Sequence, residues 1–187
     1  LSGQNVIVTS GFLEKLHDRG FANLANLRVT GRKTITQHFG ISGDGVIIEK
    51  VVFSDKQILL PQVEYCTNDV WPLVCAFGNE NNFPVLLKTA YGNGSLFVLT
   101  IPDDYGDLYH YPREVLNSIR QAISLKGAAE LDAPANIGLF TYDNNTFVIK
   151  SFLPHQQDVT LTIPKPGVQL MDVVSGSVLE GDCKRQA

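Results

Sequence analysis

Two apolar runs joined by a glycine turn and followed by a helical repeat constrain this sequence more than any other feature. Residues 84–91 (PVLLKTAY) and 95–101 (SLFVLTI) have the character of strands, and Gly92-Asn93-Gly94 between them supplies the positive φ angles of a tight hairpin. After a polar loop, Pro112 is suited to the first turn of a helix and Gly127 to its end. Apolar residues recur between them at the helical period: Val115, Leu116, Ile119, Ala122 and Ile123. The sequence therefore predicts a strand–turn–strand–helix unit.

A further strand and helix are expected at the start of the chain. Residues 5–9 (NVIVT) form a short β-branched run typical of a buried strand. Ser10 can cap a following helix, and Gly20 stands where such a helix would stop. Because a strand followed directly by a helix is the signature of α/β proteins, we predict an α/β, flavodoxin-like fold for residues 1–127. The rest of its sheet is expected before Leu1.

Between these two units the sequence has the pattern of successive strands. Turns rich in glycine, serine and aspartate separate runs of β-branched and apolar residues at 28–30, 34–39, 46–53, 58–65 and 71–77. The chain is therefore expected to be strand-rich overall.

The last third of the chain shows no helical period. Residues 137–142 and 146–152 flank the turn Asp143-Asn144-Asn145, which predicts a hairpin, and further short strands follow at similar spacing. Residues 128–134 (AAELDAP) have the composition of a linker. We predict a small all-β, sandwich-like domain over residues 135–187. Since fewer than about 60 residues are marginal for independent folding, it is expected to pack on the first part.

Composition excludes several classes of function. The net charge is −4 and basic residues are not clustered, which argues against nucleic-acid binding. No apolar run reaches the length of a membrane span, so no membrane insertion is expected. The chain begins at Leu1 and its single methionine is Met171, so we expect it to be part of a longer protein. Its cellular compartment is left undefined, since any export signal would precede Leu1.

Neither the cysteines nor the histidines have the spacing of a metal site. The cysteines, Cys66, Cys75 and Cys183, lack a C-x-x-C pair and are odd in number, so buried free thiols are expected. The histidines, His17, His38, His110 and His155, are widely separated. We therefore predict no metal and no cofactor.

The motif Tyr91-Gly92-Asn93-Gly94, followed by the apolar run Leu96-Phe97-Val98-Leu99 and a helix, resembles the end of a class I glutamine-amidotransferase-like domain. Such domains occur within β-galactosidases and other sugar-processing proteins. The tail at residues 168–181 is similar to the closing strands of β-domains in glycoside hydrolases. The resemblance implies an amidotransferase-like domain followed by a small glycoside-hydrolase-type β-domain.

The chain departs from catalytic amidotransferases in the residues that carry their chemistry. Neither Cys66 nor Cys75 has the glycines of a nucleophile elbow, and no H-x-E pair occurs. Ser10 also lacks the G-x-S-x-G context, so helix capping is its expected role. The resemblance therefore implies the fold without the chemistry.

The acidic and aromatic loop at residues 103–111 is the candidate ligand site. It follows a strand, and carboxylates together with tyrosines can bind sugar hydroxyls by hydrogen bonds and ring stacking. Its candidate binding residues are Asp103, Asp104, Tyr105, Asp107, Tyr109 and His110. Two alternatives are a Ca²⁺ site made by the three aspartates, and a solvated loop whose Tyr109 and Tyr111 fix the helix to the sheet.

We therefore expect a non-catalytic accessory or assembly region of a larger carbohydrate-related protein. One alternative is half of a hydrolase active site, completed by upstream residues. Another is a glycan-binding or adhesion module. The expected partners are upstream domains of the same protein, with a second copy of the chain and carbohydrate as further candidates.

Overall fold

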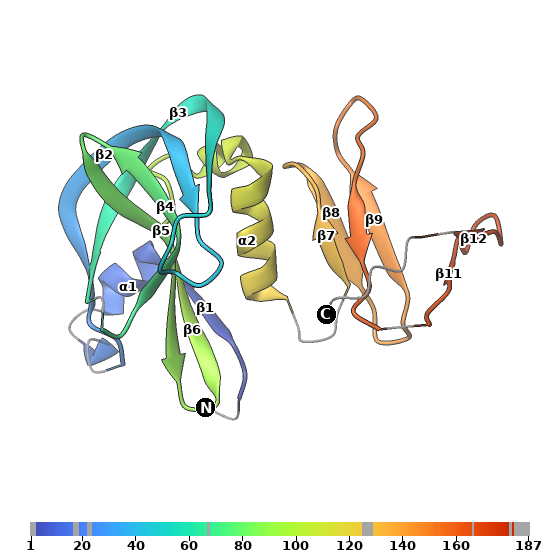
Figure 1. The fold of residues 1–187 in the computed structure, drawn as a ribbon, viewed down its shortest axis with the longest axis horizontal. Helices are drawn as coiled ribbons and strands as arrows, with labels where there is room; N and C mark the ends of the chain where they lie inside the picture. The colour runs from blue at the N-terminus through green and yellow to red at the C-terminus, as the bar shows by residue number, and fades with distance from the viewer. Residues whose placement is uncertain are drawn as a thin grey trace.

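The structure is a computed structural model that describes residues 3–16, 19–21, 24–66, 68–124, 129–165, 167–179 and 181 (Figure 1). A curved sheet forms one side of the molecule, a single long helix lies beside it, and the C-terminal strands lie beyond that helix. His17, Gly127 and Cys183, which the sequence analysis singled out, lie outside the described residues, as do parts of the predicted linker and of both predicted domains.

Six strands form one mixed sheet in the order β1-β6-β5-β4-β2-β3. Their bounds are β1 Val6–Thr9, β2 Leu27–Ile41, β3 Lys50–Tyr65, β4 Trp71–Gly78, β5 Asn81–Tyr91 and β6 Gly94–Leu99. Among the described residues β1 pairs with β6 in parallel, and the other pairings of this sheet are antiparallel. The mostly β architecture shows that the predicted α/β, flavodoxin-like fold is wrong.

The physical reason lies in the connections. Antiparallel neighbours can be joined by a short turn, whereas parallel neighbours need a crossover of about a dozen residues or more. From β2 to β6 the chain turns back through short loops, including the predicted Gly92-Asn93-Gly94 turn between β5 and β6. One strand–helix pair, β1 with α1 (Ser10–Leu16), was too little to specify a parallel sheet.

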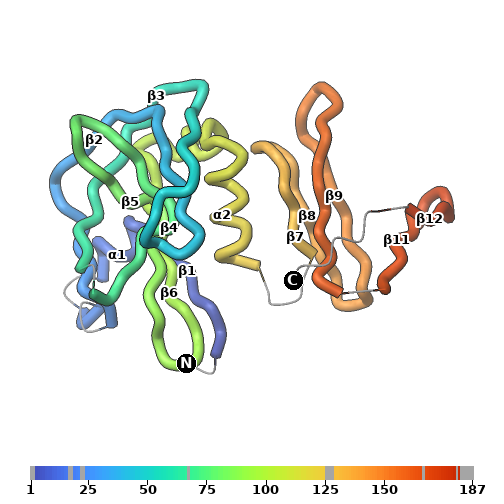
Figure 2. Tube along the Cα trace, viewed as in Figure 1, coloured from blue at the N-terminus to red at the C-terminus, as the bar shows by residue number. Residues whose placement is uncertain are grey.

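β2 and β3 are longer than the separate strands expected from the sequence. Their pairing continues past two register shifts, between Val29 and Lys33 and between Thr36 and His38. Extra residues of this kind bend a strand and increase its twist without ending the pairing. The pair accordingly follows a long curved path (Figure 2).

The core lies on both faces of the sheet. One cluster of buried side chains lies between the sheet and α2 (Arg113–Ile123) and includes Phe39, Tyr111 and Val115. The other lies under α1 and includes Leu13. Adjacent residues of β5 supply both, with Leu86 in the first cluster and Leu87 in the second. Each fully buried side chain of this size contributes about 1.5–3 kcal/mol, so both clusters stabilise the packing of the helices on the sheet.

The C-terminal strands form three two-stranded antiparallel sheets. They are β7 (Glu130–Asp132) with β10 (Thr160–Thr162), β8 (Ile137–Thr141) with β9 (Phe147–Ser151), and β11 (Leu170–Met171) with β12 (Val178–Leu179). The hairpin predicted around residues 143–145 is confirmed as β8–β9. β7 lies where a linker was expected, and a separate small core surrounds Leu131, Ala133 and Ile137.

A polar joint holds α2 against the start of this C-terminal part. We define it as Arg113, Asn117 and Arg120 of α2 together with Asp132 and the carbonyl groups that follow β7. Arg113 and Asn117 both donate to the Asp132 carboxylate, and Arg113 Nη2 also donates to the Asp132 carbonyl oxygen at 2.8 Å. Arg120 donates to main-chain oxygens of Ala133, Pro134 and Ile137.

Acidic pH is expected to weaken this joint through Asp132. The hydrogen bond from Arg113, together with that from Asn117 and the nearby arginine charges, lowers the pKa of Asp132 below its ordinary value of 3.8. A group with a lowered folded-state pKa contributes its stability above the unfolded pKa and loses it as pH falls through the folded pKa. For this half-exposed carboxylate we expect about 1 kcal/mol at neutral pH.

Urea unfolding of the chain and of its Asp132→Asn variant measures this contribution. The wild-type advantage is expected at neutral pH and should vanish as pH falls well below 3.8. Asp143→Asn, on the exposed β8–β9 turn, is the control and should leave stability within about 0.5 kcal/mol. An advantage that persists unchanged into strong acid would contradict the role of the Asp132 charge.

Candidate functional site

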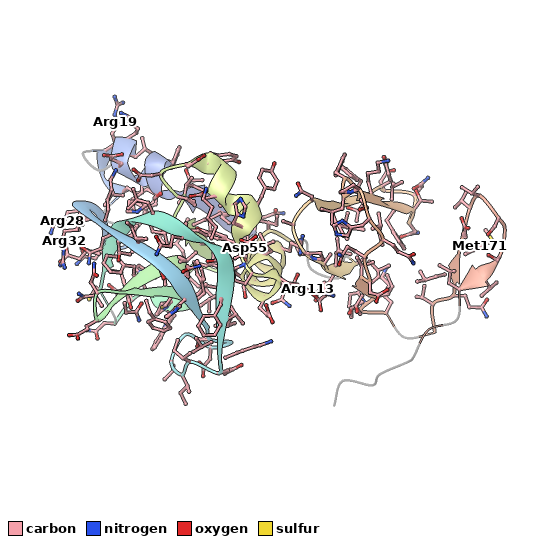
Figure 3. All side chains as sticks on the ribbon, turned by 90° about the horizontal axis from the view of Figure 1, so that it is seen from above. Arg19, Arg28, Arg32, Asp55, Arg113 and Met171 are labelled. Atoms are coloured by element: carbon pink, nitrogen blue, oxygen red, sulfur yellow. The ribbon has the colours of Figure 1, made fainter. Side chains whose placement is uncertain are left out.

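A cleft of about 360 Å³ lies between the six-stranded sheet and the C-terminal part. Three segments line it: residues 53–55 of β3, residues 109–112 before α2, and residues from the C-terminal part that include Asn136 and His155. Figure 3 places Asp55 and Arg113 on the side of the sheet nearest the C-terminal strands, and Arg28 and Arg32 at the opposite end. We call this opening the seam cleft.

Aromatic rings and polar groups share the seam cleft. Phe53 and Tyr109 are 64% and 58% exposed, which is unusual for side chains that gain most from burial. The Phe53 ring contacts that of His38 edge to face, with ring centroids 4.9 Å apart. Asp55 Oδ1 and His110 Nδ1 lie 3.0 Å apart, so the carboxylate orients the imidazole. The wall combines exposed rings with a fixed hydrogen-bonding pair.

A short 3₁₀ helix, η3 (Tyr105–His110), carries Tyr109 and His110 into the cleft. Asp104 is its N-cap, and Asp104 Oδ1 accepts a hydrogen bond from the Gly106 N–H at 2.9 Å. An aspartate that accepts a main-chain N–H in this way favours the start of a helical turn. The sequence predicted a polar loop over this segment, and the helical turn η3 was not foreseen.

The six predicted site residues are not all brought together. Tyr109 and His110 line the seam cleft, but Asp103 pairs with Lys33 at 2.5 Å and Asp107 pairs with Lys56 at 2.5 Å. The Asp107 carboxylate is buried, and its hydrogen bond raises the pKa of Lys56. Tyr105 is exposed and is not part of the cleft wall.

The separation of the aspartates bears on the Ca²⁺ alternative. Asp103 and Asp107 face different lysines, and Asp104 caps η3, so the three carboxylates do not converge on one point. Within the described ranges there is no group of three or more His, Cys, Asp or Glu side chains arranged to hold a metal ion. The geometry therefore gives the Ca²⁺ alternative no support.

The alternative in which Tyr109 and Tyr111 fix the helix to the sheet holds for one of the two tyrosines. Tyr111 is buried, its ring contacts Phe39 at a centroid distance of 5.4 Å, and its hydroxyl donates to the Thr100 carbonyl oxygen at 3.4 Å. Burial raises the pKa of the Tyr111 phenol. Tyr109 instead projects from the same segment into the cleft and stays exposed. One residue fixes η3 to the core and the other is left for contact.

The candidate nucleophiles have structural roles. Ser10 is buried, and its hydroxyl accepts a hydrogen bond from the Ile101 N–H at 3.0 Å, which ties the end of β1 to the end of β6. The capping role expected of Ser10 belongs to Thr9, whose hydroxyl accepts from the Phe12 N–H. Cys75 is fully buried, and burial raises its pKa to about 11, so its thiol is inert at neutral pH.

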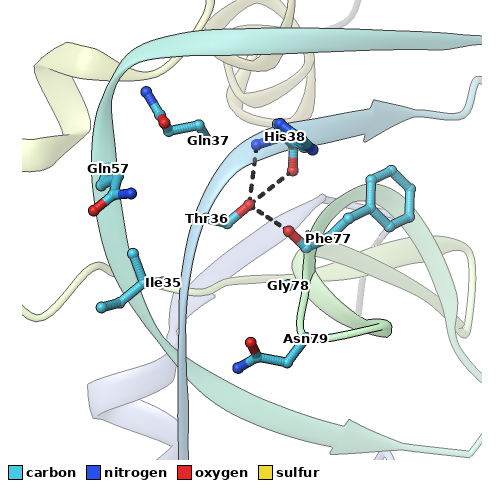
Figure 4. Close-up of a pocket in the computed structure, with 8 residues that line it drawn as sticks. All are labelled: Ile35, Thr36, Gln37, His38, Gln57, Phe77, Gly78 and Asn79. Carbon is cyan, nitrogen blue, oxygen red and sulfur yellow. Dashed lines mark hydrogen bonds between the residues drawn. The ribbon is translucent and has the colours of Figure 1, made fainter.

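A second opening of about 280 Å³ lies beside β2 and β4, near the second register shift of β2 (Figure 4). Its buried hydroxyl belongs to Thr36, which accepts from the His38 N–H at 3.0 Å and donates to the Phe77 carbonyl oxygen at 2.7 Å. This hydroxyl is therefore already committed to the main chain.

Phe53 and Asp55 are the cleft residues that sequence reasoning missed. The signal was present in the strand pattern, since Val52 and Ser54 are buried while Phe53 and Asp55 point outward. Alternation of this kind places every second residue on one face. The pattern could not show that Phe53 and Asp55 lie beside η3, because β4, β5 and β6 separate β3 from η3 in the sequence.

Fold and site together define a mostly β protein with a mixed six-stranded sheet and a short β-rich C-terminal part. Residues 2–104 match the family model described as "Uncharacterized protein SSO3021, second domain", and the chain belongs to that family. Residues 128–187 match the model described as "Probable glycosyl hydrolase, C-terminal domain". Comparison with curated proteins and with solved structures gave no match.

These matches support one of the two resemblances found in the sequence, that of the tail, and give no support to the amidotransferase-like one. The similarity of the tail to a glycoside-hydrolase β-domain is confirmed at the level of the matched C-terminal domain. Neither matching description is that of a glutamine amidotransferase, and the mixed sheet overturns the fold which that resemblance implied. Among the described residues no helix is both long and apolar enough to cross a membrane.

Proposed function

We propose that the chain is a non-catalytic accessory region of a larger carbohydrate-related protein. The observation that carries this proposal is the pairing of the carboxylates around the candidate site. Asp103 pairs with Lys33, Asp107 with Lys56 and Asp55 with His110. Glycoside hydrolysis needs two carboxyl groups facing each other across the scissile bond, one of them protonated. Carboxylates held by separate basic partners do not meet that need.

The family descriptions support a role within a longer chain. One matched model describes a second domain and the other a C-terminal domain, and both descriptions are those of parts. The glycosyl hydrolase description supports the carbohydrate-related element of the proposal. In this role the six-stranded sheet provides a rigid base, and the polar joint sets the position of the C-terminal strands.

The division into two domains, 1–127 and 135–187, is part of this proposal. The separate core around Leu131 and Ile137 supports it. β7 pairs with β10, so we amend the start of the second domain from residue 135 to the beginning of β7 at Glu130. The polar joint then serves as the interface between the two domains.

A hydrolysis screen with the chain itself tests the non-catalytic role. Chromogenic aryl glycosides of glucose, galactose, mannose and xylose, in both anomeric forms, are expected to release no more aglycone than the buffer blank. Release by the wild-type chain that disappears in Asp103→Ala or Asp104→Ala would overturn the proposal and favour a hydrolase site. Both residues lie at the surface, so these variants are expected to fold.

A further inference from the structure

We propose that the seam cleft binds a neutral saccharide of one or two sugar units. The choice of ligand class rests on the proposed carbohydrate-related function, and the cleft itself is an independent observation. Its volume of about 360 Å³ falls within the range of small-molecule sites, which begins near roughly 300 Å³. A site of this size accommodates a ring or two and little more.

The exposed rings supply the apolar contact. Phe53 comes from β3 and Tyr109 from η3, so the two side chains reach the cleft from elements that are far apart in sequence. A sugar ring has an apolar C–H face and a rim of hydroxyls, and aromatic side chains with one wet end suit such ligands. Covering rings of this size removes apolar area from water, which favours binding.

The polar groups supply the hydrogen bonds. The contact joins Asp55 Oδ1 to His110 Nδ1, so Asp55 Oδ2 and His110 Nε2 take no part in this hydrogen bond. Carboxylate, imidazole and amide groups can each pair with a hydroxyl, which both donates and accepts. The C-terminal part adds such groups in its share of the wall: Asn136, His155 and Gln157.

The charge of the wall selects a neutral ligand. Among the described residues that line the seam cleft there is no lysine or arginine, whereas phosphate and carboxylate ligands are usually held by such groups. The nearby Lys56 is engaged by the buried Asp107 carboxylate. Asp55 is the one acidic side chain in the part of the wall that the structure describes, and an anionic sugar would meet repulsion from it.

Saturation-transfer NMR of the chain with methyl glucoside, methyl galactoside, methyl mannoside, maltose, cellobiose, lactose and glucuronate tests the inference. At least one neutral sugar is expected to receive saturation and to bind more tightly than glucuronate. Tyr109→Ala and Phe53→Ala should each weaken that binding by about tenfold, as loss of an aromatic anchor does. Asp55→Asn should weaken it less, since an amide still accepts a hydrogen bond.

Tyr142→Ala is the matched control. Tyr142 is 57% exposed against 58% for Tyr109, but it lies beside the β8–β9 turn and outside the cleft wall. The affinity of the Tyr142→Ala variant for the neutral sugar should stay within about twofold of that of the wild type. No saturation of any neutral sugar, tighter binding of glucuronate, or an equal loss in Tyr142→Ala would overturn the inference. Each of these outcomes leaves the hydrolysis screen unaffected, so the two proposals fail separately.

Discussion

Replacing Arg120 with methionine is expected to lower the free energy of unfolding by about 3 kcal/mol, because several carbonyl groups then lose a charged donor. The guanidinium is half-buried, and burial lowers its pKa, which is the mark of a charge held away from water. It donates to Pro134 O at 2.9 Å and also to oxygens of Ala133 and Ile137. Methionine keeps the apolar stem and offers no donor.

Urea denaturation of the wild type and of Arg120→Met measures the loss. Arg32→Met is the control, since Arg32 is exposed on β2 at the far end of the sheet (Figure 3), and it should change stability by less than about 0.5 kcal/mol. Equal unfolding curves for all three proteins would show that the polar joint is not what holds the C-terminal part. The variant should also weaken saccharide binding, because Pro134 and Asn136 line the seam cleft.

Replacing Gly94 with alanine is expected to destabilise the chain by about 3 kcal/mol, because β1 must move away from β6 to admit the new methyl group. Gly94 starts β6, and a Cβ there would meet the main-chain oxygen and carbon of Gln4, just before β1, inside van der Waals contact. A main-chain neighbour cannot rotate aside as the end of a flexible side chain can. The β1–β6 pairing, which runs from Val6–Leu96 to Thr9–Leu99, is therefore weakened.

Gly11→Ala is the matched control for this change. Gly11 lies in α1, where a Cβ would meet nothing within 4 Å, and alanine favours the helix by up to about 1 kcal/mol. Thermal unfolding should therefore show a lower melting temperature for Gly94→Ala and an unchanged or higher one for Gly11→Ala. Amide hydrogen exchange in β1 and β6 should rise in Gly94→Ala. Unchanged exchange there would contradict the close approach of Gln4.

Local chemistry explains which elements could be predicted. The β5–β6 hairpin, α2 and the β8–β9 hairpin are specified by turn residues and by periodicity within a few residues of each other. The placement of β1 beside β6 depends on pairing across about ninety residues, for which the sequence carries no local signal. β7 is only three residues long and finds its partner β10 much later in the chain, so it was taken for a linker.

The candidate site divides in the same way. Tyr109 and His110 could be picked out because their loop is unusually acidic and aromatic. The ion pairs of Asp103 and Asp107 could not be predicted. Their partners Lys33 and Lys56 lie on β2 and β3, which are far from the loop in the sequence. Asp55 could not be recognised as a site residue from the sequence, because only the tertiary structure brings it into contact with His110.

We propose above that this chain engages carbohydrate without cleaving it. A single NMR time course tests it, in which the chain is mixed with maltose, cellobiose and lactose and the anomeric proton signals are followed. We expect saturation transfer from the protein to at least one disaccharide, while every disaccharide signal keeps its intensity. Growth of monosaccharide anomeric signals with the wild-type chain, absent with Asp103→Ala or Asp104→Ala, would contradict the non-catalytic role of the chain.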